Sequence, residues 1–392
     1  MAKVDYSKFP LFRDIDLAGL QRLQEREHVF GPTPPNVFVG RVGYPDINWG
    51  PLVSVDADSS ASMPILDNPA KWYGMDYGKI VEMQISMVRS KSRLNVSGRT
   101  ALLEKAQDAV MSVKPVDAEI TFAHKPHFNM DFSHFLQPMG SSAPLKDFTI
   151  CDNPVVPKKV DELIEEKVKA SDAASELYDN GRGHDVYYLT RLLSAGILGR
   201  QGSQKLVPTR WSITAVDDMI AKQMLEKIRE APEISDYQVY SSEFLYNHFE
   251  ILLMPGRWEF EQFEAWAAGS FWDLGKPVYN IEHEYEPFEG RTAYADQEGG
   301  GYYAGRLGVV EALARRGRQA RAVIFREIGS EYNVPVGVWT VREASRHAMA
   351  GQAKRFTTMN EALAHLSTKL KIPISEYRKR SSILPQTRLS DF

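Results

Sequence analysis

The spacing of hydrophobic and polar residues predicts helices through most of the first half of the chain. Apolar residues there recur every three or four positions, which is typical of helices that bury one face. The predicted helices cover residues 14–30, 72–90, 99–112, 158–179 and 185–196. Strands are expected at residues 36–45, where a short strand leads into a turn, and at 116–123, where apolar residues alternate.

The pattern changes to a period of two near residue 234. Residues 236–240 and 246–254 are typical of paired antiparallel strands. Further strands are expected at 278–285, 322–328 and 334–340, and helices at 303–316, 341–350 and 358–370. This order predicts an α+β fold with mixed or antiparallel sheets and packed helices. We expect a short flexible tail at residues 373–392, which contain a basic run and two prolines.

The stretch Leu206-Val-Pro-Thr-Arg-Trp-Ser-Ile-Thr-Ala-Val-Asp-Asp218 is typical of the start of a long amphipathic helix. Pro208 disfavours helix before it, and Ser212 or Thr214 is the expected N-cap. Arg210 and Trp211 add nothing to this helix start. A cation and an aromatic ring beside free helical N–H groups are suited to hold a phosphate. The alternative is an arginine paired with Asp217 or Asp218 over a packed tryptophan.

The stretch Trp258-Glu-Phe-Glu-Gln-Phe-Glu-Ala-Trp266 places carboxylates between aromatic residues. Its spacing fits neither a clean helix nor a clean strand. Glu259, Glu261 and Glu264 are therefore either catalytic acids or, as is commoner, carboxylates at the rim of an aromatic core.

Composition narrows the class of protein. Of 392 residues, 43% are apolar and 25% are charged, as in an ordinary globular protein. The net charge of −4 means that any contact with nucleic acid must come from a local basic patch. No apolar run is long enough to span a membrane, and the first residues lack the apolar core of a signal peptide. We expect a cytoplasmic protein.

Arginines beside glycines are the candidates for phosphate binding. Arg41 lies between Gly40 and Gly43, where it serves either a buried ion pair or a phosphate clamp. A glycine run, Gly299-Gly300-Gly301, precedes the helix that carries Arg306, and such a run at a helix start favours anions. Arg306, Arg315, Arg316, Arg318 and Arg321 make this part the most basic of the chain; it is either a solvated face or a contact for nucleic-acid phosphates.

An enzyme acting on a nucleotide or on nucleic-acid ends is one hypothesis from these residues. Its phosphate-binding candidates are Arg41, Arg210, Trp211, Arg291, Gly300 and Arg306. Its catalytic candidates are Asp217, Asp218 and Glu327. The phosphate-binding and the catalytic roles both require that these residues meet in one cleft near Arg210 and Asp217. If they are scattered, a structural adaptor without a pocket is the alternative.

The best candidate for a metal site is the group His124, His127 and His134 with Asp131. Its spacing matches no dedicated metal motif, so structural or surface histidines are the expectation. Cys151 is the single cysteine, which excludes an internal disulfide and any site built from several cysteines. We expect no metal and no cofactor.

The last residues carry apolar anchors on a polar tail, a pattern that serves binding rather than folding. Gln386, Leu389 and Phe392 stand at three-residue spacing. This resembles the motif by which replication and repair proteins bind the sliding clamp PCNA, although only one aromatic residue is present. The resemblance implies that Leu389 and Phe392 enter an apolar pocket of the clamp and that Gln386 hydrogen-bonds at its edge.

Several stretches resemble the archaeal Nre DNA-repair proteins. They are Val37-Phe-Val-Gly-Arg-Val-Gly-Tyr-Pro45, Gly50-Pro-Leu52, Leu206 to Asp218, Glu264-Ala-Trp266, Gly300-Gly-Tyr-Tyr-Ala304, Arg318-Gln-Ala320 and Val336-Gly-Val-Trp-Thr-Val-Arg-Glu343. The resemblance covers nearly the whole chain and implies a role in DNA damage and clamp binding. It also implies an N-terminal-type Nre domain at residues 1–275 and a C-terminal-type domain at residues 276–372. DNA is a further candidate partner. The resemblance implies no established reaction, so no catalytic residue is carried over. Many members have a cysteine-rich segment near the N-terminus that this sequence does not contain.

Overall fold

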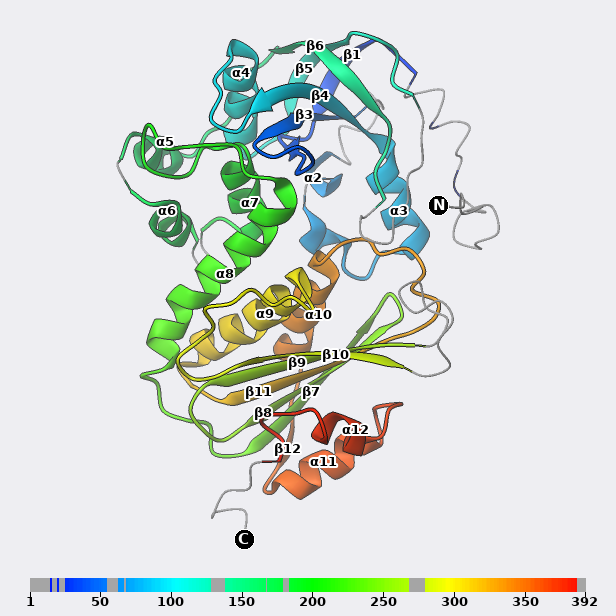
Figure 1. Cartoon of the computed structure of the whole chain (residues 1–392), viewed down its shortest axis with the longest axis vertical. Helices are drawn as coiled ribbons and strands as arrows, with labels where there is room; N and C mark the ends of the chain where they lie inside the picture. Colours follow the sequence, from blue (N-terminus) through cyan, green and yellow to red (C-terminus); the bar gives the residue numbers. More distant parts are fainter. Residues whose placement is uncertain are drawn as a thin grey trace. The chain divides into compact units, whose positions relative to one another are not determined.

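The chain folds into two units, and each unit is built on a six-stranded mixed sheet (Figure 1). The computed structural model describes residues 15, 20, 25–54, 63–66, 68–127, 138–166, 168–178, 183–267 and 279–385. The units divide between Val216 and Asp217. Two mixed sheets with packed helices confirm the predicted α+β class.

The sheet of the first unit has the strand order β1-β5-β6-β4-β3-β2. Its strands are β1 (His28–Thr33), β2 (Val37–Val39), β3 (Asp46–Ser54), β4 (Met87–Asn95), β5 (Val116–Phe122) and β6 (Ser142–Ile150). Neighbouring strands are antiparallel except β4 and β6, which are parallel. Trp49, Ile47 and Phe148 are fully buried, so the core of this unit lies against the sheet.

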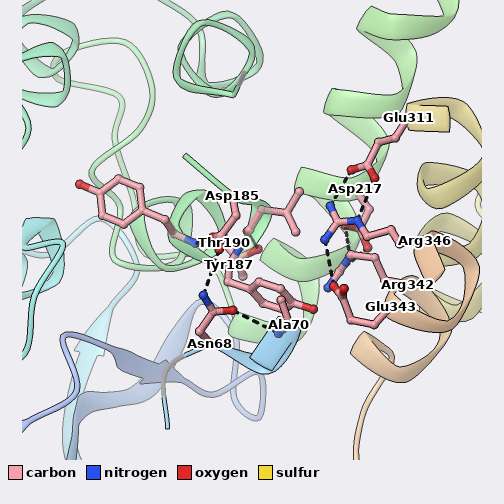
Figure 2. Close-up of polar contacts among 12 residues, drawn as sticks. Asn68, Ala70, Asp185, Tyr187, Thr190, Asp217, Glu311, Arg342, Glu343 and Arg346 are labelled. Carbon is pink, nitrogen blue, oxygen red and sulfur yellow. Dashed lines mark hydrogen bonds and ion pairs between the residues drawn. The ribbon is translucent and has the colours of Figure 1, made fainter. Parts of the chain in front are cut away.

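The helices that the structure describes in the first unit are mostly short. They are α2 (Met63–Leu66), the 3-10 helix η4 (Pro69–Trp72), α3 (Tyr77–Ser86), α4 (Ala101–Met111), α5 (Lys158–Glu165), α6 (Ala170–Leu177) and α7 (Val186–Ser194). The carboxylate of Asp185 caps α7, accepting from the N–H groups of Tyr187 and Tyr188, and Asn68 donates to it as well (Figure 2). Helix α8 (Thr209–Ile228) starts in this unit and continues into the second.

The sheet of the second unit has the order β10-β9-β11-β8-β7-β12. Its strands are β7 (Tyr237–Phe244), β8 (Asn247–Met254), β9 (Glu259–Trp266), β10 (Asn280–Glu286), β11 (Arg321–Ile328) and β12 (Lys354–Phe356). Only β9 and β11 are parallel. Both the β7–β8 hairpin and β11 were predicted, because their apolar residues form short runs between turn residues.

Helices cover both faces of this second sheet (Figure 1). One face carries α9 (Gly300–Arg316) and α10 (Trp339–Ala350), and the other carries α11 (Met359–Ser367) and α12 (Ile374–Arg378). Strand β9 is buried on both sides: Phe260 contacts Tyr302 of α9, whereas Phe263 contacts Tyr377 of α12. This explains the unclear period of the stretch, since a strand between two layers needs no polar face.

The carboxylates of β9 correct the expectation of a polar rim. Glu261 and Glu264 are buried, and only Glu259 is partly exposed. Each has a partner that lies far away in the sequence: Arg321 for Glu259, Ser381 for Glu261 and Arg326 for Glu264. A buried carboxylate requires a cation or several hydrogen-bond donors. These three glutamates therefore pair with residues inside the unit rather than with solvent.

Four other predictions were wrong in detail. The helix expected at 72–90 ends at Ser86, where the chain joins the sheet as β4, and that expected at 158–179 is the two helices α5 and α6. Residues 334–340 form no strand, because Gly337 adopts a φ of 115° and α10 begins at Trp339. Helix α8 begins at Thr209, directly after Pro208, and not at the expected caps Ser212 or Thr214.

The flexible tail expected at residues 373–392 is wrong over residues 373–385. Residues Ile374–Arg378 form α12, and Tyr377, Ile383 and Leu384 are buried in the core on the α11 side of the sheet. The basic run at residues 378–380 suggested a solvated tail, but the apolar residues on either side of it pack into this core. Residues 386–392, where the clamp-binding motif is expected, lie outside the described residues.

Candidate functional site

The interior of the second unit, between the sheet and α9, is rich in ion pairs. Arg306 lies at its centre with 1% of its side chain exposed. Its guanidinium donates to Glu286 and to Asp218, each at 2.5 Å, and lies 5.5 Å from the ring centres of Tyr302 and Tyr303. Burial lowers the pKa of Arg306, but the two carboxylates and Tyr302 outweigh it, so the net shift is upward. Arg306 is therefore a permanent buried cation.

Glu286 collects further donors at this centre. It accepts from the hydroxyl of Tyr302 at 2.8 Å and from the indole N–H of Trp258 at 3.1 Å. Burial raises the pKa of the Tyr302 hydroxyl, and the adjacent Glu286 raises it further. Tyr302 therefore remains a neutral donor. Three donors hold the carboxylate of Glu286: Tyr302 and Arg306 on α9, and Trp258 directly before β9.

Arg291 reaches the same aromatic ring from the loop between β10 and α9. Its guanidinium lies 4.9 Å from the centre of the Tyr302 ring and donates to Glu284 at 2.5 Å. Glu284 also accepts from the backbone N–H of Gln297 at 2.8 Å. Arg291 and Arg306, both phosphate candidates from the sequence, thus converge on Tyr302, but each is held by carboxylates of the chain itself.

The glycine run at the start of α9 lies among acidic side chains. A Cβ added at Gly301 would stand 2.4 Å from Oε1 of Glu264, so glycine is needed for the close approach of the helix to β9. Glu298 is buried just before the helix; burial raises its pKa well above the ordinary value, and Glu264 and Glu284 raise it further. The role of Gly300 in phosphate binding stays a prediction. The carboxyl groups of Glu264, Glu284 and Glu298 around this helix start favour a cation rather than an anion.

Asp217 forms a buried ion pair with Arg342 in the second unit (Figure 2). Its two carboxylate oxygens accept from Nε and Nη2 of Arg342 at 2.9 and 2.6 Å. Burial raises the pKa of Asp217, and Arg342 opposes that shift. One turn further along α10, Arg346 donates to Glu311 of α9 and to Glu343, so a row of charges joins α8, α9 and α10. Asp218 forms ion pairs with Lys222 and with Arg306.

Glu327, the third catalytic candidate, anchors the segment after α11. It accepts from the backbone N–H groups of Lys371 and Ile372 at 2.8 and 2.9 Å and from the hydroxyl of Tyr377 at 3.0 Å. Glu261 holds the next part of the chain in the same way, through Ser381 and the N–H of Ser382. The sequence did not mark this role, because the donors are backbone groups that no side-chain pattern announces.

A second group of candidates lies on the first unit. Arg41, Arg210 and Trp211 are all exposed. The ring of Trp211 contacts that of Tyr44 at 5.1 Å between centroids, with an angle of 54° between the ring planes. Trp211 is thus an exposed aromatic rather than the packed one that we considered as an alternative. Sequence reasoning missed Tyr44 as its neighbour, although it stands in the turn that follows Arg41.

The second unit also has an open groove of about 810 Å³ near the C-terminal end of α9. Arginines and carboxylates share its lining: Arg316, Arg318, Arg355, Glu233 and Asp236. Arg355 pairs with Asp236 at 2.7 Å, and Arg316 donates to the hydroxyl of Tyr240. The mixture of signs gives this groove no clear preference for an anion.

Within the described ranges, no group of three or more His, Cys, Asp or Glu side chains is placed to hold a metal ion. His124 and His127 are exposed there, whereas His134 and Asp131 lie outside those ranges. Among the helices that the structure describes, none has both the length and the apolar character that a membrane span requires.

Comparison with known proteins identifies the family. Residues 6–273 match the model of the N-terminal part of archaeal Nre proteins, and residues 286–392 match that of the C-terminal part. The DNA repair protein NreB of Archaeoglobus fulgidus is 37% identical over 361 residues, which are 92% of this chain and 90% of the relative. NreA of Haloferax volcanii is 35% identical over 379 residues, 93% and 89% of the two chains. NreA of A. fulgidus is 33% identical over 389 residues, 98% and 95% of the two chains. No solved structure matches significantly. The chain belongs to the archaeal Nre family.

Proposed function

We propose that this chain is a DNA-repair factor that binds the sliding clamp PCNA through Gln386, Leu389 and Phe392. The repair role is supported by the three relatives, each of which is named a DNA repair protein. Clamp binding is carried by one observation, the spacing of the three residues, which places a hydrogen-bonding side chain and two apolar side chains one helical turn apart.

The segment before the motif supports the proposal by providing a fixed base. Ile383 and Leu384 are buried, and Arg321 donates to the backbone carbonyl of Ile383 at 3.2 Å. The hydroxyl of Ser381 accepts hydrogen bonds from the backbone N–H groups of Ile383 and Leu384. Pro385 is exposed. A chain that ends after Pro385 keeps all these contacts, so removal of the motif should leave the fold intact.

Calorimetric titration of PCNA tests the proposal. The full chain should bind with micromolar or tighter affinity, and the chain that ends after Pro385 should not bind. The double variant Leu389→Ala/Phe392→Ala should lose binding in the same way, because both apolar anchors are gone. Thr387→Ala, which changes an intervening residue, is the matched control and should bind like the natural chain. Unchanged affinity of the truncated chain would refute clamp binding through this motif.

The alternative of an enzyme acting on a nucleotide or nucleic-acid phosphate stays a prediction. It requires a cleft that holds Arg210 and Asp217 together. Arg210 belongs to the first unit and Asp217 to the second, where Arg342 occupies both carboxylate oxygens. A catalytic role for Asp217 would need that ion pair to open.

A further inference from the structure

Two exposed aromatic rings and three arginines gather on the surface of the first unit. We propose that Tyr44 and Trp211, with Arg41, Arg93 and Arg210, form a binding surface for single-stranded DNA. In this surface, which we call the aromatic platform, unpaired bases stack on the two rings and the guanidinium groups contact phosphates. The inference rests on the DNA-repair role proposed above but not on clamp binding.

The aromatic pair is the first argument. Tyr44 and Trp211 each leave 43% of their surface exposed, although they come from segments that are far apart in the sequence. Tryptophan is usually largely buried, and an exposed pair of large rings contributes little to folding. Flat rings on the surface are what a nucleic-acid base needs for stacking, and this contact tolerates any base because every base has a π-face.

The start of α8 holds Trp211 in place. Just before it, the hydroxyl of Thr209 accepts from the backbone N–H of Val39 at 2.9 Å and hydrogen-bonds the hydroxyl of Ser194 at 3.0 Å. The Ser194 hydroxyl also hydrogen-bonds the carbonyl of Val207 at 2.9 Å. The helix start is therefore fastened to β2 and α7. A ring on such a base loses little freedom when a ligand binds, which favours affinity.

The turn that carries Tyr44 is equally fixed. The N–H of Tyr44 donates to the carbonyl of Arg41, and that of Asp46 to the carbonyl of Gly43 at 2.9 Å. Gly43 adopts a φ of 84°, and a Cβ there would lie 2.8 Å from the carbonyl oxygen of Asp46, so the tight turn requires glycine. The N–H of Val96 donates to the carbonyl of Pro45 and ties the end of the turn to the chain after β4.

The charges around the rings match a polyanion. Arg41 stands in the turn itself, Arg210 directly precedes Trp211, and Nη2 of Arg93 would lie 3.3 Å from a Cβ at Gly43. All three arginines are exposed. The carboxylate of this turn, Asp46, accepts from the side chain of Asn95. Arginine offers several donors in a plane and suits phosphate oxygens.

The exposed rings favour single-stranded over double-stranded DNA as the ligand. In a duplex the faces of the bases are covered by their neighbours, so side chains reach only the base edges in the grooves. Tyr44 and Trp211 offer ring faces and few hydrogen-bonding groups, and the ligand that uses them is a strand whose bases are free to stack. A repair protein meets such strands where damaged DNA is opened or resected.

Fluorescence anisotropy with a labelled oligothymidylate of about 15 nucleotides tests the proposal with the full chain. The natural chain should bind it and should bind a duplex of the same length more weakly. Tyr44→Ala and Trp211→Ala should each weaken binding by about 5- to 150-fold, the range for loss of one base–aromatic stack. Trp211→Tyr keeps an aromatic ring and should restore most of the affinity. Phe30→Ala, which removes an exposed aromatic of β1, is the matched control and should have no effect.

The arginines give a separate readout. Arg41→Ala, Arg93→Ala and Arg210→Ala should each reduce the slope of log K against log salt concentration by about 0.7, the value for one phosphate contact on a single strand. The ring variants should leave that slope unchanged. On an oligonucleotide made of abasic sites, the ring substitutions should lose their effect while the arginine substitutions keep theirs.

Three results would overturn the proposal: no binding of the oligothymidylate by the natural chain, equal binding by the doubly substituted Tyr44→Ala/Trp211→Ala chain, or a preference for the duplex. Thermal unfolding checks that the variants fold. Because the two rings are exposed, their removal should leave the midpoint temperature of unfolding unchanged. The assay contains no clamp and can be repeated with the chain that ends after Pro385. Failure of clamp binding and failure of the aromatic platform are therefore distinguishable.

Discussion

Removal of Arg342 should destabilise the second unit strongly, because it leaves Asp217 buried without its cation. In Arg342→Met, both hydrogen bonds to the carboxylate disappear, one of 2.9 Å and one of 2.6 Å. Asp217 is fully buried, so water cannot replace them. Loss of one partner of a buried ion pair costs about 3–5 kcal/mol of unfolding free energy.

An exposed ion pair of the same unit gives the matched control. Arg355 and Asp236 are 2.7 Å apart, but 65% of the Arg355 side chain is exposed. Because solvent screens this pair, Arg355→Met should change the unfolding free energy by no more than about 1 kcal/mol. The contrast between the two arginines separates the effect of burial from the effect of losing one positive charge.

Urea unfolding followed by far-ultraviolet circular dichroism measures both variants. The loss in Arg342→Met should be smaller at about pH 5 than at about pH 8, because burial raises the pKa of Asp217 and the orphaned carboxyl takes up a proton. The double variant Asp217→Leu/Arg342→Met should be more stable than Arg342→Met, since no uncompensated charge remains. A double variant whose destabilisation equals the sum of the two single ones would refute the reasoning.

Two further predictions concern the helix α9 and the carboxyl before it. Glu298 has a pKa raised above its ordinary value of 4.5, so the stability it contributes is complete below about pH 4.5 and is lost as the pH rises through its folded pKa. Glu298→Gln should therefore reduce the fall in unfolding free energy between about pH 5 and pH 8, by up to about 1.4 kcal/mol per pH unit; an unchanged pH profile would contradict this. Gly308→Ala should destabilise by about 1–3 kcal/mol in urea unfolding, although alanine favours helix, because its Cβ would lie 2.7 Å from that of Ser345 on α10; a gain in stability would show that the two helices can separate without cost.

The elements that the sequence predicted well are those whose local pattern agrees with their burial. The β7–β8 hairpin and β11 are short apolar runs between turns, and α4 and α11 have one apolar face. The predictions failed where a segment contacts two layers or is completed by a distant partner. Strand β9 has apolar and acidic residues on both faces, and its carboxylates are acceptable only because Arg321, Arg326 and Ser381 come from other parts of the chain.

The candidate site followed the same division. The sequence singled out Arg210 and Trp211 as residues that the start of α8 does not require, and the structure leaves both exposed. It did not pair Trp211 with Tyr44, because nothing in the spacing of either motif refers to the other. The two stretches meet through Val39 and Thr209, which are 170 residues apart along the chain.

By itself, the sequence determined the α+β class, the place of most helices and strands, and the residues whose chemistry exceeds what their element needs. Those properties depend on neighbours within one or two turns, and the periods of 3.6 and 2 record them directly. Tertiary structure alone decided that Asp217 holds Arg342, 125 residues away, that Glu327 fastens the segment after α11, and that Tyr44 and Trp211 share one surface. Such partners are chosen by the packing of whole layers, in which a charge is tolerated only where a distant segment supplies its counterpart.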